Sequence, residues 1–326
     1  LEIMGHEKGE YDIINPNDDV NKSQSTNDTY PAALKLTTKY SFGQLTNEIE
    51  SLLDAFEELA VENKDIELMG MTQLRNAVKM SYFDLFHGYA ASLKDALQNI
   101  ENSLEAMNEI ALGGTAIGTG IGAPKGFGEK AVEYLNSFTT FKFAYSTEAV
   151  SIISDPGDFA TVSSALKQFA IRIGKITDDI RLLASSRFGN ITIPAKQLGS
   201  SIMPGKINPV IPEAMNAVSM VVLGNDNMIS NCLQSGQLQL NPFVPLIAHK
   251  LLDSSSCLKN AIALFEKECV RGIKVNAVPD FKNNDDTDYL THLVDKIGYK
   301  AATQIRVEAE KKGVSPSQIA REKGLE

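Results

Sequence analysis

One loop of the sequence, GSSIMPGKINP, combines several side chains that could act on a single ligand. It holds a pair of serines, Ser200 and Ser201, followed by Lys206 and Asn208. The prolines at its end are typical of the first turn of a helix, so the loop should lead directly into a helix N-terminus. Backbone N–H groups, hydroxyls and a cation gathered at such a place can hold an anion. The spacing therefore predicts an anion-binding site.

Two other motifs match patterns of different chemistries in the wrong context. Gly118–Ala123 fits the dinucleotide pattern G-x-G-x-x-[GA], but a helical pattern precedes it where a strand is required. We interpret it as a sharp, flexible connection between helices. His6 and Glu7 begin an H-E-x-x-E string that lacks the second histidine of a zinc protease, and the remaining histidines are scattered. We therefore expect neither a bound nucleotide nor a metal.

The composition narrows the class of protein. Among 326 residues, 31 Lys and Arg stand against 41 Asp and Glu, and this net charge of -10 argues against nucleic acid as a partner. Sparse cysteines without a C-x-x-C pair, at Cys232, Cys257 and Cys269, favour reduced thiols in a cytoplasmic protein. No run of 18 apolar residues occurs, so no membrane span is expected.

Long helices must position the loops. Apolar residues recur at alternating spacings of three and four, which is the pattern of helices packed at a shallow angle in a bundle. The stretches with this pattern are 45–59, 93–111, 162–183 and 251–269. A helix from about 159 to 185 would span roughly 40 Å at its rise of 1.5 Å per residue. Helices this long normally bury against several others, often across subunits. The sequence predicts an all-α fold, a long-helix bundle.

Loops with unusual backbone chemistry separate these helices. Residues 12–29 are polar, residues 113–126 contain six glycines, and residues 186–209 contain the serine pair, three prolines and three glycines. Loops held between rigid helices commonly carry functional sites. Residues 276–288 read as a linker, followed by short helices at about 297–311 and 315–323. Ser315 should cap the second of these, with proline at its first position.

GSSIMPGKINP resembles the signature of the aspartase/fumarase superfamily. NPNDDVNKSQSTNDTYP at 15–31, GMTQLRNAV at 70–78 and GGTAIGTG at 113–120 are similar to its other blocks, so the resemblance extends over nearly the whole chain. The opening LEIMGHEKGEY, Gln73 and GQLQLN at 236–241 favour the aspartase branch. Histidine is typical of fumarases at the position of Gln73.

The resemblance implies elimination of ammonia from L-aspartate to give fumarate. Ser200 would be the general base that removes the Cβ proton, and no cofactor is expected. The sequence has no Ala-Ser-Gly triplet, which excludes the self-formed cofactor of the aromatic amino-acid ammonia-lyases. The nearest alternative is a fumarate hydratase or another fumarate-releasing lyase. An alternative of another class is a catalytically inactive structural homologue or fragment.

The resemblance also implies which residues hold the two carboxylates of this small dicarboxylate substrate. Lys206 and Asn208 would hold the α-carboxylate. Ser25, Thr26 and Ser201 would hold the β-carboxylate, where negative charge develops during the reaction.

The remaining implied contacts concern the amino group and a second subunit. Asn27 and Gln73 would contact the amino group, and Thr72 would touch a carboxylate from another subunit. Glu213 matches the acid that pairs with the fumarase histidine. Each residue alone has a structural interpretation, since a Ser-Thr-Asn run is usually a helix cap.

The superfamily implies a homotetramer in which three subunits build each active site. On this basis we expect three segments: 1–28 as a remnant of an N-terminal domain, 29–272 as the central helical-bundle domain, and 273–326 as part of a small C-terminal helical domain. The family's G-T-S-x-N-M-N segment is absent from the sequence. We therefore expect the 326-residue chain alone to have little activity.

The second block departs from the superfamily's usual residues at three positions. Met71 replaces the usual arginine, Arg75 the usual glutamine and Asn76 the usual aspartate. The lead-in to the serine pair is also shorter than usual. These departures motivate the alternative of an inactive homologue.

Overall fold

The computed structural model describes residues 1–197, 203, 206–276 and 285–325. Contacts divide the chain into two compact units. The first unit comprises Leu1–Leu52, Ser92–Asp178 and Val210–Glu266, and the second comprises Leu53–Ala91, Asp179–Pro209 and Lys267–Glu326.

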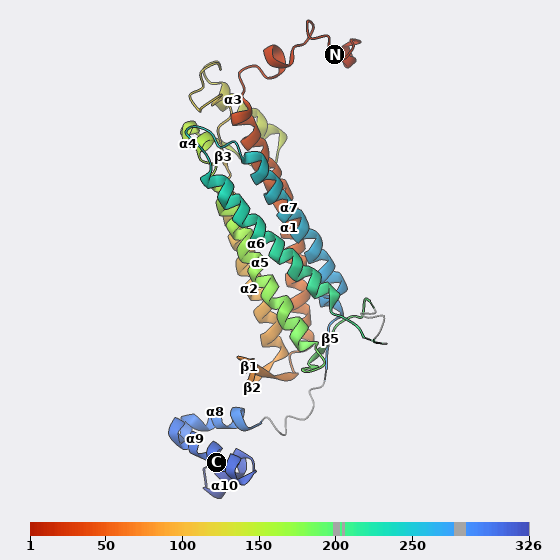
Figure 1. Ribbon diagram of the computed structural model, residues 1–326, viewed down its shortest axis with the longest axis vertical. Coiled ribbons are helices and arrows are strands. Elements are labelled where there is room, and N and C mark those ends of the chain that lie inside the picture. Colours follow the sequence, from red (N-terminus) through yellow and green to blue (C-terminus); the bar gives the residue numbers. More distant parts are fainter. Residues whose placement is uncertain (198–202, 204–205, 277–284, 326) are drawn as a thin grey trace. The chain divides into compact units, whose positions relative to one another are not determined.

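Long helices dominate the chain, as the sequence predicts (Figure 1). The long helices are α1 (Thr26–Glu62), α2 (Tyr82–Glu105), α5 (Asp158–Leu183), α6 (Val210–Gln234) and α7 (Val244–Glu268). Two shorter helices, α3 (Phe127–Phe138) and α4 (Ala149–Ser154), follow the glycine-rich loop. The predicted fold class, a long-helix bundle, is confirmed.

The predicted apolar seams form the core. Val162, Phe169 and Ile173 of α5 are fully buried, because their spacing of three and four keeps them on one face of the helix. The seam predicted over 93–111 is only partly helical. Helix α2 ends at Glu105, and Met107 reaches the core from beyond its end.

Polar side chains join each long helix of the first unit to the next, around a closed ring. The bonds are Lys39 Nζ to Leu104 O (2.9 Å), Arg172 Nη1 to Ser92 O (2.7 Å), Lys167 Nζ to Asp226 Oδ2 (2.6 Å), Asn225 Nδ2 to Ser254 Oγ (3.0 Å), and Ser255 Oγ with Ser41 Oγ (2.8 Å). They connect α1, α2, α5, α6, α7 and again α1. Because a buried polar group needs a partner, these bonds fix which helices are neighbours.

The described residues also contain short strands, which the sequence does not predict. In the second unit β1 (Glu67–Thr72) and β2 (Arg75–Ser81) form an antiparallel hairpin, and β5 (Ile191–Thr192) pairs with β6 (Lys274–Val275). In the first unit β3 (Glu109–Ile110) pairs in parallel with β4 (Ala144–Tyr145).

Short helical turns occur at η1 (Glu2–Met4), η2 (Pro16–Val20) and η3 (Val270–Gly272). The interpretation of 12–29 as a loop is corrected, since η2 and the start of α1 lie within it.

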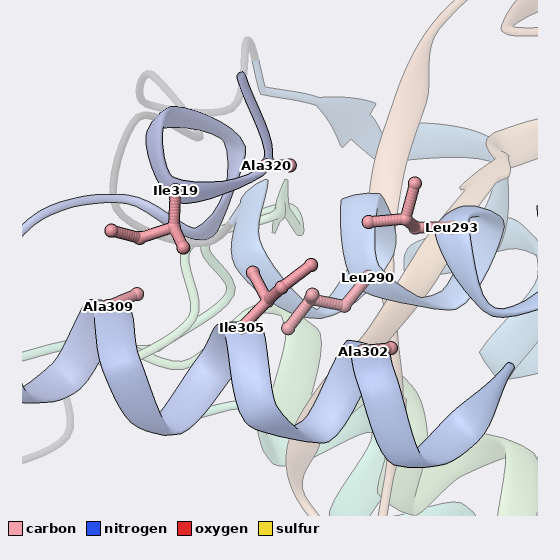
Figure 2. Close-up of a cluster of buried hydrophobic side chains, with 7 residues drawn as sticks. All are labelled: Leu290, Leu293, Ala302, Ile305, Ala309, Ile319 and Ala320. Carbon is pink, nitrogen blue, oxygen red and sulfur yellow. The ribbon is translucent and has the colours of Figure 1, made fainter. Parts of the chain in front are cut away.

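Three helices form a small core at the C-terminal end of the second unit: α8 (Asp285–Ile297), α9 (Tyr299–Lys312) and α10 (Pro316–Glu322). In Figure 2, Ile305 of α9 points toward Leu290 of α8. Ser315 Oγ accepts a bond from Gln318 N–H at 3.3 Å, which confirms the predicted cap.

The linker predicted over 276–288 is wrong where α8 begins, at Asp285; residues 277–284 lie outside the described part. The three-segment domain division stays a prediction.

Candidate functional site

Ser25 caps the N-terminus of α1, where the first predicted block of binding residues begins. Ser25 Oγ accepts a hydrogen bond from Asn27 N–H at 3.2 Å, and Asp28 Oδ1 accepts one from Ser25 N–H at 3.0 Å. The Asp28 bond is that of a capping box with aspartate in place of glutamate, while the Ser25 hydroxyl caps the N–H of Asn27. The two bonds satisfy two N–H groups at the end of the helix. The predicted residues Ser25, Thr26 and Asn27 are thus brought together on one turn.

The same turn is attached to the glycine-rich segment, residues 113–122. Asp28 Oδ2 accepts hydrogen bonds from Gly113 N–H at 3.1 Å and from Thr115 N–H at 2.8 Å. Two blocks quoted from the sequence, which are more than 80 residues apart, therefore lie in contact.

Burial and hydrogen bonding act in opposite directions on the Asp28 carboxyl. Burial raises its pKa above the usual value, while N–H bonds from Ser25, Thr115 and Gly113 oppose that rise. The side chain is 1% exposed. A carboxylate this buried is stable only with such donors.

The glycine-rich segment is a fixed connection. Gly118 has φ +89°, and a Cβ there would lie 2.3 Å from the Val150 backbone nitrogen, so only glycine fits. Thr115 has φ +58°, which is uncommon for a β-branched residue. Its Oγ1 donates to Ile121 O at 2.9 Å. These contacts restrict the conformation of the segment.

Thr26 and Asn27 also line a cavity of about 240 Å³ in the first unit. Its other lining residues are mostly apolar or proline, and none is cationic. Asn241, from the GQLQLN motif, has both polar groups engaged. Its Nδ2 donates to Cys232 O at 3.0 Å and its Oδ1 accepts from Phe243 N–H at 2.9 Å. Asn241 therefore links α6 to α7, and this cavity by itself does not suit a dianion.

Thr72 and Gln73 lie at the tip of the β1–β2 hairpin in the second unit. Thr72 pairs with Arg75, and the two turn residues, Gln73 and Leu74, both have positive φ, at 51° and 59°. Such turns normally use Asn or Gly, so two larger residues here carry backbone strain. All of these tip residues are exposed.

The loop that carries the serine pair, residues 199–209, is called the serine loop here. The structure describes its residues 203 and 206–209. Lys206 is exposed, its N–H donates to Met203 O at 3.2 Å, and Asn208 is half-buried. The loop leads into α6, as predicted, and the exposed Glu213 lies in the first turns of that helix. Ser200 and Ser201 lie outside the described residues.

The structure therefore places the predicted residues in two groups. Ser25, Thr26 and Asn27 belong to the first unit. Thr72 and Gln73 of the hairpin, and Lys206 and Asn208 of the serine loop, belong to the second. The sequence-based list omitted Asp28. Its position three residues after Ser25 is the spacing of a capping box, which was the available signal.

Cysteine and metal chemistry have little support in the described part of the chain. Burial raises the pKa of the Cys269 thiol to about 12, and burial likewise raises the pKa of Cys232 and Cys257. Such thiols are poor nucleophiles because they stay protonated. Among the described residues, no three His, Cys, Asp or Glu side chains are grouped to hold a metal ion. Nor does any helix there combine the length and apolar character needed to cross a membrane.

Comparison with known families gives a match over most of the chain. The family described as lyase matches residues 2–224. The chain belongs to this lyase family. The resemblance to the aspartase/fumarase superfamily, and to its aspartase branch, is confirmed by the relatives found across the whole chain.

Two similar relatives within the lyase family are named aspartate ammonia-lyase. The protein from Pseudomonas aeruginosa is 40% identical over 100% of this chain and 70% of its own length. The protein from Escherichia coli is 38% identical over 100% of this chain and 69% of its own length.

Solved structures of lyases share the fold. A fumarate lyase:delta crystallin from Brucella melitensis bound to cobalt has a TM-score of 0.92 and 39% identity, covering 100% of this chain and 72% of that one. A class II fumarase from Schistosoma mansoni has a TM-score of 0.90 and 27% identity, and the match covers 95% of this chain and 69% of that one. The fold alone therefore does not choose between the members of the family.

Proposed function

We propose that this protein is a carbon–nitrogen lyase that eliminates ammonia from L-aspartate to give fumarate. The observation that carries the proposal is 38–40% identity to aspartate ammonia-lyases over the whole chain. The fumarase from Schistosoma mansoni is 27% identical over 95% of the chain. Gln73, in place of the histidine typical of fumarases, points the same way.

In the proposed reaction Ser200 removes the Cβ proton of aspartate. The electron pair left on Cβ is first held as an enolate-like form of the adjacent carboxylate and then forms the C=C bond as the C–N bond breaks. Ammonia leaves with the C–N electron pair, and the proton on Ser200 is released to regenerate the base. A serine acts this way only with a depressed pKa, which loop N–H groups and a nearby cation can provide.

The substrate contacts that accompany this step are also proposals. Hydroxyl and N–H donors at the β-carboxylate stabilise the charge that develops there. Ser25, Thr26 and Ser201 would supply these donors. Ser25 suits this role because its cap uses only the oxygen as an acceptor, and within the described residues its O–H donates no bond.

Lys206 and Asn208 would hold the α-carboxylate. Asn27 and Gln73 would contact the amino group, and Thr72 of another subunit would touch a carboxylate.

We further propose a homotetramer whose sites are shared among subunits. Apolar side chains remain exposed along α6, including Met220 at 70% and Val221 at 46%. Several exposed apolar side chains on one helix are typical of an interface. A shared site agrees with the presence of predicted binding residues in both compact units.

The choice of substrate is tested by fumarate formation, followed by its ultraviolet absorbance, with aspartate and malate as separate substrates. We expect a faster rate from aspartate. Faster release from malate would make the protein a fumarate hydratase. No release from either, in a version of the protein that carries the G-T-S-x-N-M-N segment, would favour an inactive homologue.

A further inference from the structure

Asp28 joins two distant segments beside the proposed binding residues. One carboxylate oxygen accepts the N–H of Ser25, and the other accepts the N–H groups of Gly113 and Thr115. Its burial makes these three charge-assisted bonds strong and geometrically restrictive. A simple helix cap would need only the first of them.

The glycine-rich segment in turn fixes the side chain of Asn27. Ala116 follows Thr115 directly, and its carbonyl oxygen accepts a bond from Asn27 Nδ2 at 2.8 Å. A carbonyl can only accept, so it selects the amide orientation in which the NH₂ group faces Ala116. Within the described part of the chain, Asn27 Oδ1 accepts no hydrogen bond, so the acceptor side of the amide remains for a ligand.

We propose that Asp28 is a positioning residue that orients the Asn27 amide, through the segment from Gly113 to Ala116, to accept a hydrogen bond from the substrate's amino group. The inference rests on the proposed function for the identity of that group. A substrate ammonium has donors and no acceptor, so it requires Oδ1 and is repelled by a reversed amide. The orientation of one amide thereby contributes to recognition of an amine.

The segment from Gly113 to Ala116 needs a contact from outside itself to keep the Ala116 carbonyl in this orientation. Thr115 lies in the left-handed region, where a β-branched residue is uncommon, so its conformation must be held by its surroundings. The bond from Thr115 N–H to Asp28 holds it at the residue just before Ala116.

The chain offers a matched control for the capping role alone. Ser81 and Asp84 form a Ser-x-x-Asp box at the start of α2, with Ser81 N–H donating to Asp84 Oδ2 at 3.1 Å, as Ser25 N–H donates to Asp28, and Asp84 N–H donating to Ser81 Oγ at 3.0 Å. Within the part of the chain that the structure describes, the hydrogen bonds of Asp84 are all to Ser81, so Asp84 holds no distant segment there. Asp84→Asn therefore removes a comparable cap without disturbing Asn27.

The test compares Asp28→Asn, Asp84→Asn, Asn27→Ala and the double variant of Asp28 and Asn27. We expect Asp28→Asn to raise the KM for aspartate, and for ammonia in the reverse reaction, about tenfold, as for loss of one hydrogen bond to a charged group. The KM for fumarate should stay within about twofold, and Asp84→Asn should leave all three within about twofold. In the Asn27→Ala background, Asp28→Asn should add less than about twofold, because the two residues act on the same contact.

Additive effects in the double variant would overturn the proposal. So would unchanged KM values in an Asp28→Asn variant that is merely less heat-stable. If Asp28→Asn does not fold, Asp28→Glu carries the same test, because it keeps the carboxylate of a capping box and moves its oxygens away from the N–H groups of Gly113 and Thr115. The amine-specific pattern of KM changes is expected, and wild-type values would contradict it.

Hydrogen exchange separates this inference from the proposed function. Failure to form fumarate from aspartate, in a version of the protein that carries the G-T-S-x-N-M-N segment, would refute the function. The positioning claim would then rest on exchange of the peptide that contains residues 113–116. Faster exchange in Asp28→Asn and unchanged exchange in Asp84→Asn would support it, whereas equal protection in both would overturn it.

Discussion

Lys206 is the one cation among the proposed binding residues. It lies near the end of the serine loop, exposed and four residues before α6 begins. The N-terminal end of a helix favours an anion, and a nearby ammonium adds to that preference. We expect Lys206→Met to weaken aspartate binding by about 1.5–3 kcal/mol, which raises KM roughly 10- to 150-fold.

Initial-rate measurements over a range of aspartate concentrations test this expectation. Lys130→Met is the matched control, since Lys130 pairs with Glu133 on the exposed face of α3. An unchanged KM in Lys206→Met, or an equal rise in both variants, would remove Lys206 from the site.

The residues proposed to bind the substrate could be predicted from the sequence, whereas a residue that holds them in position could not. Family-like blocks identified Ser25, Thr26 and Asn27, and the structure places these on one turn. Asp28 was passed over because a motif identifies contacts with a ligand, whereas the Asp28 contacts are with backbone N–H groups of a segment 85 and 87 residues away. No local sequence pattern encodes a contact between residues so far apart in the chain.

At the scale of elements, periodicity predicted the long helices well. The helix expected over about 159–185 is α5, Asp158–Leu183, because its apolar residues repeat without interruption. The β1–β2 hairpin was missed because its turn, Gln73-Leu74, lacks the Asn or Gly that normally marks such a turn. Helix α8 was missed at its start because its first residues are polar and suggest a linker.

The contact between α9 and α10 provides an element-scale prediction about pH. Glu308 accepts bonds from Lys312 at 2.9 Å and from Lys323 at 2.6 Å, and these lower its pKa from 4.5 to about 2. The folded pKa lies below the unfolded one, so this stabilisation is present above about pH 4.5 and is lost as the pH falls toward 2.

Hydrogen exchange of α10 measures this effect. We expect faster exchange in Glu308→Gln than in the wild type at pH 5, with the difference shrinking as the pH falls. High salt should reduce it too, because the pair is partly exposed to solvent. A difference that grows on acidification would contradict the assignment.

At the scale of the whole molecule, the exposed strip on α6 predicts assembly. Met220, Val221, Leu223 and Met228 lie on one helix of the first unit with between 37% and 70% of their surface exposed. A charge placed in a buried apolar interface is costly to desolvate. We expect Met220→Glu to convert a homotetramer into smaller species and, because the proposed sites are shared, to lose activity with it.

Light scattering at micromolar concentration measures the assembly. Val307→Glu, at a similarly exposed apolar position on α9, is the control and should remain tetrameric. A wild-type monomer would refute the proposed tetramer, and an active tetrameric Met220→Glu would exclude this strip as the interface.

The central claim is that a serine base in this chain eliminates ammonia from aspartate. The most direct measurement is the rate of fumarate release at saturating aspartate in the wild type, Ser200→Ala and Ser137→Ala, each in a version that carries the G-T-S-x-N-M-N segment, with aspartate binding measured in each. Ser137 is a suitable control because it is exposed on α3 and, among the residues that the structure describes, its hydroxyl donates to Tyr134 O alone. General-base catalysis is worth about 10²–10⁴-fold, so Ser200→Ala should lose at least that much of kcat while still binding aspartate, and Ser137→Ala should match the wild type. A Ser200→Ala variant that keeps more than about a tenth of the wild-type kcat would contradict the account, since the base would then have to lie elsewhere.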